Sequence, residues 1–110
     1  MERLFVYGTL APGRANHGVV ESIPGTWETA TLRGVLLDDG WGSNMGFPGI
    51  VPTEDGEDVQ GYVLSSHSLS KYWAMLDEFE GGGYRRTTVS VRIETGDVVE
   101  AWVYALNHSL

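Results

Sequence analysis

The chain has 110 residues, 42% hydrophobic and 20% charged, which is the composition of one globular domain, 1–110, able to bury a core without disulfides or structural metal. Its 7 basic and 15 acidic residues give a formal net charge of −8, which repels phosphate backbones and anionic membranes and argues against either as a partner. There is no cysteine, and the first apolar run is too short for a signal peptide or membrane span, so we expect a cytoplasmic protein.

The first apolar stretch, Leu4 to Tyr7, is a continuous run of strand-forming residues that predicts a strand buried on both faces. Gly8 ends this strand in a sharp turn, and the following segment to Arg14 contains a second glycine. Such a loop can aim several backbone N–H groups at one point, as an anion or oxyanion site requires. The alternative is an ordinary turn from a strand into a loop.

The middle of the chain predicts strands and loops in alternation. Residues 16–23 form either one short helix or an irregular segment, and residues 27–37 form a long strand with a bulge at Gly34. The prolines in residues 47–52 exclude a central strand and indicate a loop that closes over the domain. Alternation over residues 59–65 predicts another strand.

One helix is predicted, through residues 71–80. Ser66 or Ser68 can cap its start, and the glycines at 81–83 end it. Residues 87–93 and 98–106 are rich in β-forming residues and flank a short loop with one glycine, which predicts a hairpin. About six strands with one or two helices and short connections indicate an α+β domain built on a small, largely closed barrel.

A phosphate-binding loop is the first chemistry to test, because Gly8 and Gly13 have the spacing of GxxxxGK[ST] after a strand. Arg14 and Ala15 replace the lysine and the hydroxyl residue that hold phosphate and magnesium. We therefore reject a nucleoside triphosphatase.

Two further site classes lack their sequence patterns. His17, His67 and His108 are far apart and form no HxH or HExxH arrangement, so we expect no metal site. The G-x-S-x-G motif of a serine hydrolase is absent, and the serines fit loop and capping positions.

The end of the predicted helix carries the strongest candidate. At about 100° per residue, Glu80 falls near the middle of an apolar face, with Asp77 at its edge and Glu78 on the opposite side. Burial and the negative end of the helix dipole both raise a carboxyl pKa, which suits a general acid and base near neutral pH. The alternative is that Glu80 is a fraying helix end or forms a structural ion pair with a nearby arginine. The apolar face also contains Leu69, Tyr72, Trp73, Leu76 and Phe79.

Two features follow Glu80 directly. The glycines at 81–83 form either a simple helix stop or a flexible floor that lets a substrate approach closely. Tyr84 and Arg86 alternate on the next strand and share a face, where they either support a polar site or cover the barrel end.

The motifs YGTL (7–10), FPG (47–49) and LDEFEG (76–81) followed by Tyr84-x-Arg86 resemble the γ-glutamylcyclotransferase-like family. The resemblance is strongest to the γ-glutamylamine cyclotransferase and plant avirulence-induced branch, and it spans nearly the whole chain. It implies a small mixed β-barrel flanked by helices, with Glu80 as the proton acceptor and no cofactor. The residues expected to bind substrate are Tyr7, Gly8, Thr9, Leu10, Pro48, Gly49, Tyr84 and Arg86.

The leading functional hypothesis is therefore an enzyme that cyclises a small γ-glutamyl amide or amine, releasing 5-oxoproline and the free amine. A non-catalytic small-molecule-binding or regulatory module with the same pocket is the alternative. A third possibility is removal of a γ-glutamyl group from a larger biosynthetic intermediate. The sequence leaves both a monomer and a weak homodimer open.

Overall fold

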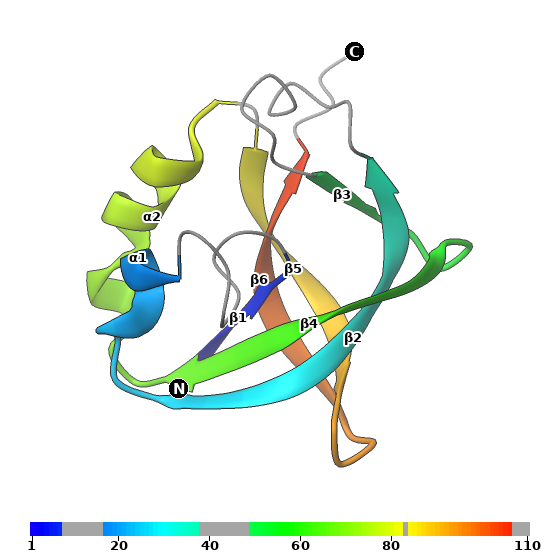
Figure 1. Cartoon of the computed structure of the whole chain (residues 1–110), viewed down its shortest axis with the longest axis horizontal. Helices are drawn as coiled ribbons and strands as arrows, with labels where there is room; N and C mark the ends of the chain where they lie inside the picture. The colour runs from blue at the N-terminus through cyan, green and yellow to red at the C-terminus, as the bar shows by residue number, and fades with distance from the viewer. Residues whose placement is uncertain (8–16, 38–48, 83, 107–110) are drawn as a thin grey trace.

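The structure is a computed structural model that describes residues 1–7, 17–37, 49–82 and 84–106 (Figure 1). The described part contains six strands, two short α-helices and one 3₁₀ turn. In chain order these are β1 (Glu2–Val6), α1 (Gly18–Glu21), β2 (Thr26–Leu37), β3 (Gly49–Pro52), β4 (Glu57–Ser66), the 3₁₀ turn η2 (Leu69–Lys71), α2 (Trp73–Glu80), β5 (Tyr84–Ile93) and β6 (Val98–Leu106).

The strands form one mixed sheet in the order β3-β2-β4-β1-β6-β5. β1 lies antiparallel to β4 and parallel to β6, and every other pairing is antiparallel. A short pairing between β2 and β5, at Ala30 with Ile93 and Thr31 with Arg92, closes five of the strands into a barrel. β3 adds a sixth strand beyond β2. The predicted small mixed barrel is confirmed.

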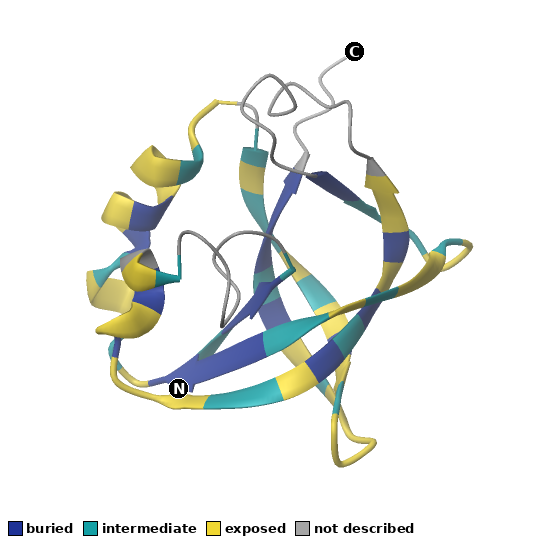
Figure 2. Ribbon diagram, in the orientation of Figure 1, coloured by how far each residue is buried: buried dark blue, intermediate teal, exposed yellow. Residues whose placement is uncertain are grey.

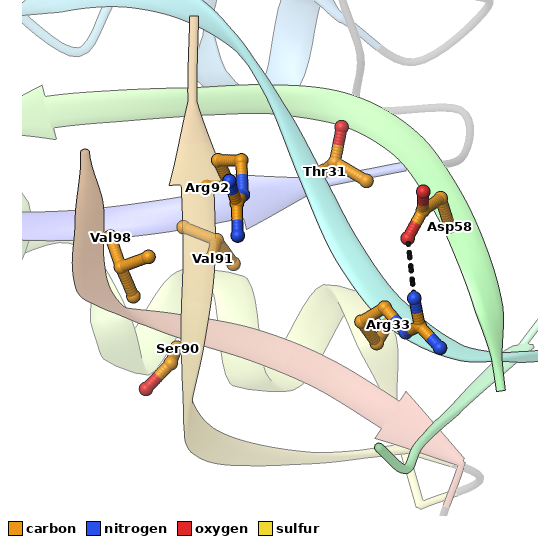
Figure 3. A pocket seen from close by; sticks show the side chains of 7 residues that line it. All are labelled: Thr31, Arg33, Asp58, Ser90, Val91, Arg92 and Val98. Carbon is orange, nitrogen blue, oxygen red and sulfur yellow. Dashed lines mark hydrogen bonds and ion pairs between the residues drawn. The ribbon is translucent and has the colours of Figure 1, made fainter. Parts of the chain in front are cut away.

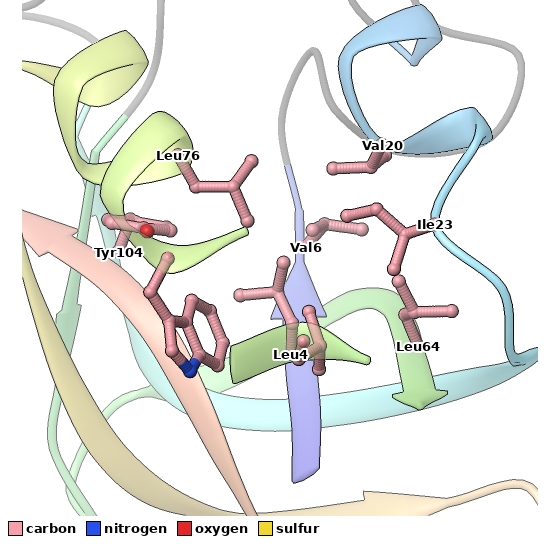
Figure 4. Close-up of a cluster of buried hydrophobic side chains, with 9 residues drawn as sticks. Leu4, Val6, Val20, Ile23, Leu64, Leu76 and Tyr104 are labelled. Carbon is pink, nitrogen blue, oxygen red and sulfur yellow. The ribbon is translucent and has the colours of Figure 1, made fainter. Parts of the chain in front are cut away.

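Two hydrophobic clusters result from the alternation of β1, which is largely buried (Figure 2). Leu4 and Val6 pack with residues of the helices (Figure 4), whereas Phe5 belongs to the cluster inside the barrel. The outer cluster joins β1 to residues of α1, η2 and α2, and its helical members include Val20, Leu69, Trp73 and Leu76. The inner cluster draws only on strands and includes Ile50, Val63, Val91 and Val103. The predicted burial of the first strand on both faces is thus confirmed.

The barrel wall is tight where β4 crosses β1. A Cβ added at Gly61 would lie 2.4 Å from the carbonyl oxygen of Val6 and 2.6 Å from the Phe5 ring. Only glycine fits this close approach without moving the backbone of β1.

Gly34 does not carry the predicted bulge. β2 continues through it in one register, and Gly34 lies opposite both Pro52, the last residue of β3, and Glu57, the first of β4. The irregularity lies in the partner strands, whose connecting turn at 53–56 is placed opposite Gly34. A Cβ at Gly34 would lie 2.8 Å from the Val51 carbonyl oxygen, which explains the glycine by close approach.

The predicted loop at residues 47–52 is wrong for its described part, because residues 49–52 form β3 at one end of the sheet order. The prolines still exclude a central position, and Pro52 closes the strand.

The predicted helix is divided into η2 and α2. Neither predicted serine caps α2, because Ser68 lies before η2 and the Ser66 hydroxyl accepts a hydrogen bond from the Ser68 N–H at 3.0 Å. Tyr72 occupies the N-cap of α2 without a side-chain hydrogen bond. Trp73 and Leu76 are buried as expected, but Phe79 is 38% exposed and lies off the buried face.

Candidate active site around Glu80

Glu80 is the last residue of α2, and the helix ends at Gly81, which has a φ of 77° and donates its N–H to the Asp77 carbonyl at 3.1 Å. This left-handed φ favours glycine, so one glycine suffices to end the helix. Glu80 is half-buried, and burial raises the pKa of its carboxyl from 4.5 to about 7. Burial, one of the two predicted causes, accounts for this shift. Glu78, two residues earlier, is exposed.

Three tyrosines approach Glu80 from three strands. The Glu80 carboxylate raises the pKa of Tyr7 at the end of β1, of Tyr84 at the start of β5 and of Tyr104 near the end of β6. Burial is the larger cause in each case. Three of the predicted site residues, Glu80, Tyr7 and Tyr84, therefore interact electrostatically.

The Tyr7 hydroxyl connects the end of β1 to β6 and β3. It donates a hydrogen bond to the Tyr104 carbonyl at 2.7 Å and accepts one from the Ile50 N–H at 3.1 Å. These bonds fix Tyr7, the first residue of the predicted substrate loop 7–10, and they place Gly49, the first residue of β3, next to that contact. Through these two hydrogen bonds, the Tyr7 side chain links β1, β3 and β6 at this end of the barrel.

Other predicted binding residues fall outside the described part of the chain. These are Gly8, Thr9, Leu10 and Pro48. Their roles remain predictions.

Arg86 contacts α2 rather than Glu80. Its Nε lies 3.0 Å from Asp77 Oδ1 and its NH2 group 3.3 Å from Asp77 Oδ2. The guanidinium carbon also stacks at 4.4 Å from the Trp73 ring centroid and 4.8 Å from that of Trp102. The Arg86 hydrogen bond holds the pKa of the Asp77 carboxyl below its usual range, and Tyr104 contributes to the same shift.

Three further contacts of this cluster were not predicted. The Tyr104 hydroxyl donates to Asp77 Oδ1 at 2.7 Å. The Glu2 carboxylate accepts hydrogen bonds from the indole N–H groups of Trp73, at 3.3 Å, and Trp102, at 3.2 Å. The amphipathic pattern placed Asp77 at the edge of the buried face, which was a usable signal, but nothing local marks Glu2 or Tyr104.

A separate pocket of about 380 Å³ lies near the other end of β5 (Figure 3). Arg33 from β2 and Asp58 from β4 form an ion pair across it at 3.5 Å, beside Ser90, Val91 and Arg92 of β5. Arg92 lies eight positions after Tyr84 on β5, a distance of roughly 25 Å in an extended chain. This pocket is therefore remote from Glu80.

Metal ligands do not gather in the described residues, where no three side chains of histidine, cysteine, aspartate or glutamate could hold an ion together. His17 packs its ring against Trp27 at 5.3 Å between centroids, and His67 is exposed. None of the described helices combines the length and the apolar character needed to cross a bilayer.

Residues 4–110 match the family model described as gamma-glutamyl cyclotransferase, AIG2-like. The chain belongs to this family. It is 30% identical over 112 residues to the gamma-L-glutamyl-butirosin B gamma-glutamyl cyclotransferase of Niallia circulans, an alignment that covers 97% of this chain and 68% of the relative. Family membership, predicted from YGTL and LDEFEG, is confirmed.

Solved structures show the same fold. YkqA from Bacillus subtilis superposes with a TM-score of 0.74 at 29% identity, covering 98% of this chain but only 36% of that longer one. An AIG2-like protein from Mus musculus gives a TM-score of 0.72 at 26% identity, covering 100% of this chain and 80% of the mouse protein. The γ-glutamyl cyclotransferase fold therefore accounts for the mixed barrel.

Proposed function

We propose that this protein cyclises the γ-glutamyl group of an amide substrate, releasing 5-oxoproline and the free amine, with Glu80 as the proton-transfer group. The observation that carries the proposal is the half-buried Glu80 carboxyl, with a pKa of about 7, which interacts electrostatically with Tyr7, the first residue of the predicted substrate loop. A carboxyl with this pKa is about half ionised at neutral pH, so it can both accept and return a proton.

The reaction needs one nucleophile, and the substrate supplies it. The Glu80 carboxylate accepts a proton from the substrate α-amine as its nitrogen attacks the γ-carbonyl carbon and closes a five-membered ring. The resulting tetrahedral oxyanion collapses with cleavage of the bond to the leaving nitrogen. Glu80 then returns the proton to that nitrogen, which leaves as the free amine. Every atom comes from the substrate, so the step uses no cofactor.

The oxyanion requires donors, and we assign them to the backbone N–H groups of residues 8–10, immediately after Tyr7. Each such donor contributes about 3 kcal/mol of transition-state stabilisation. The two bonds to the Tyr7 hydroxyl support this assignment, because they fix the point at which the loop leaves β1. Gly49 and Pro48 would border the substrate from the side of β3, and Tyr84 from β5.

The leaving amine is the open part of the proposal. The relative from Niallia circulans is named for a γ-L-glutamyl-butirosin B substrate, which favours including large γ-glutamylated molecules beside simple amines. The substrate class proposed here is therefore any γ-glutamyl amide with a free α-amine.

The test is release of 5-oxoproline from a panel of γ-glutamyl amides of small amines, amino acids and larger polyamines. We expect turnover by the wild-type protein and a loss of about 10³-fold or more in Glu80→Gln, which keeps the side chain's shape but cannot take the proton. Glu78→Gln is the matched control, because Glu78 is exposed on the same helix, and it should retain wild-type turnover.

Three results would contradict the proposal. A folded Glu80→Gln protein with wild-type turnover would exclude this carboxyl as the base. Ligand-induced thermal stabilisation without product, in both wild type and Glu80→Gln, would support the non-catalytic binding module instead. Absence of both binding and product across the panel would exclude γ-glutamyl amides as substrates.

A further inference from the structure

Asp77 lies three residues before Glu80, about one helical turn away on α2. Its carboxylate accepts three hydrogen bonds, two from Arg86 on β5 and one from the Tyr104 hydroxyl on β6. The last turns of α2 are thus tied to two strands at one side chain. Trp73, the first residue of α2, donates its indole N–H to Glu2 on β1, and Asp77 holds the following turn, which leads to Glu80, against β5 and β6.

Arg86 is itself held in place. Its guanidinium stacks against Trp73 from α2 and Trp102 from β6, and only 23% of the side chain is exposed. Both indole N–H groups donate to Glu2 on β1. A planar guanidinium with a two-point contact to a carboxylate and stacked aromatic faces has a fixed orientation, which a lysine could not reproduce.

We infer that Asp77 and Arg86 are positioning residues that fix the last turn of α2 against β5 and β6 and so hold the Glu80 carboxyl in its half-buried place at the site. This inference rests on the proposed role of Glu80. It also assigns Arg86 to the support of α2 instead of the predicted role in substrate binding.

Two other roles for the pair make different predictions. Arg86 could act on Glu80 only through its charge, in which case the loss of both partners would leave Glu80 nearly unchanged, because one positive and one negative charge are removed together. Arg86 could instead bind the substrate, in which case its loss would weaken substrate binding and raise KM. A positioning role predicts that Glu80 becomes exposed to water when the pair is removed.

The decisive variant is therefore the charge-balanced double substitution Asp77→Asn with Arg86→Gln. The carboxyl of Glu80 is titrated by carbon-13 NMR in the wild type and in the variant, without substrate. We expect its pKa to fall by at least about one unit from its wild-type value, because exposure to water removes the burial that raises it. The other titrating groups that face Glu80 are Tyr7, Tyr84 and Tyr104, whose raised pKa values lie outside this pH range.

The matched control is the double variant Asp58→Asn with Arg33→Gln, which removes the exposed ion pair shown in Figure 3. It makes the same change in charge at a site remote from α2. We expect the pKa of Glu80 in this control to equal that of the wild type.

A kinetic measurement on a turned-over γ-glutamyl amide adds a second readout. The Asp77/Arg86 double variant should lose about 10-fold or more in kcat while KM changes by less than about 3-fold, since positioning affects the reacting geometry more than substrate binding. The two single variants should each lose nearly as much as the double, because either substitution removes the two-point contact between Arg86 and Asp77. Arg86→Lys keeps the charge without the two-point contact, so its kcat should lie between those of Arg86→Gln and the wild type. This variant replaces the double variant as the test if the double variant does not fold.

The outcomes separate the inference from the function on which it rests. An unchanged Glu80 titration in a folded double variant overturns the positioning role, whatever the activity. If KM rises by about 10-fold or more while kcat is unchanged, the positioning role is overturned in favour of substrate binding by Arg86. If the wild type turns over no γ-glutamyl amide but the pKa of Glu80 still falls in the double variant, the catalytic proposal fails and the structural role of the pair stands.

Discussion

An arginine–aspartate ion pair lies near each end of β5, and the two pairs differ in what surrounds them. At the Tyr84 end, Arg86 pairs with Asp77 at 3.0 Å, and at the Ile93 end the Arg33–Asp58 pair lies across a pocket at 3.5 Å. The side chains of the first pair are 23% and 47% exposed, and those of the second 58% and 60%. Composition alone does not distinguish them.

The difference lies in the neighbouring groups. Tyr104 and two tryptophan rings surround the first pair, and Glu80 lies one helical turn from it. The second pair has one further contact, from Arg33 to the carbonyl of Glu54 at 3.2 Å. An exposed ion pair is screened by water and contributes little, whereas the same pair beside a half-buried carboxyl can fix a reacting group. The candidate site therefore differs from the exposed pair in the number of groups that converge on it and in their burial.

The largest expected effect is on stability, and it concerns Glu80. Its carboxyl binds its proton more tightly in the folded state, so between pH 4.5 and about 7 the unfolded state holds fewer protons and wild-type stability falls as pH rises. Glu80→Gln removes this loss, so its stability relative to wild type should grow by up to about 3 kcal/mol between pH 4 and pH 8. Urea unfolding at both pH values measures the difference.

Glu78→Gln provides the comparison on the same helix, because the Glu78 side chain is exposed. Its stability relative to wild type should stay constant over the same pH range. A constant difference for Glu80→Gln as well would show that the Glu80 carboxyl is not buried in solution.

The second prediction is the pH profile of turnover. As the proposed base, Glu80 must be ionised, so kcat/KM should fall below an apparent pKa of about 7, by about 10-fold per pH unit and about 100-fold at pH 5. The control variant Arg33→Gln should show the same limb. If kcat/KM of the wild type instead falls only below about pH 4.5, an exposed carboxyl controls the rate.

Most of the fold follows from local signals that agree with one another. The apolar run at Leu4, the β-rich hairpin and the helix ending at Gly81 each combine periodicity with a turn or stop signal. The bulge predicted at Gly34 was wrong, because the irregularity at that point belongs to the turn between β3 and β4. The sequence of β2 gives no information on its partner strands.

The candidate site could be predicted where it depends on one element. The helical period alone places Glu80 toward the barrel. The contact of Tyr104 with Asp77 depends on the β5–β6 register, which sets Arg86 opposite Tyr104. A register shifted by one residue would set Arg86 opposite Ala105, and the length of the turn does not decide between them. Long-range contacts such as that of Glu2 with Trp102 have no local signal at all.

The third prediction compares the Tyr7 hydroxyl, which is part-buried, with the exposed hydroxyl of Thr95 in the turn after β5. Tyr7→Phe leaves the Ile50 N–H and the Tyr104 carbonyl without their shared partner, so it should lower the free energy of unfolding by about 2 kcal/mol. Thr95→Ala, in the β5–β6 turn, removes only exposed bonds to Asp97 and should lower it by less than about 1 kcal/mol. Equal losses in urea unfolding would show that the Tyr7 hydroxyl does not hold the barrel end.

The smallest expected effect is at the exposed ion pair. Replacing Arg33 by Gln should change the free energy of unfolding by less than about 1 kcal/mol, because two exposed side chains gain little from pairing in water. The difference from wild type should shrink further as sodium chloride is raised from about 0.05 M to about 1 M, since salt screens exposed charges. Arg86→Gln is the counterpart, because the Arg86 guanidinium stacks on Trp73 and makes two hydrogen bonds to Asp77. This substitution should lower the free energy of unfolding by more than Arg33→Gln does, and the decrease should depend less on salt. Equal losses with equal salt dependence would mean that burial does not separate the two pairs, and the assignment of Arg86 to the support of α2 would lose its energetic basis.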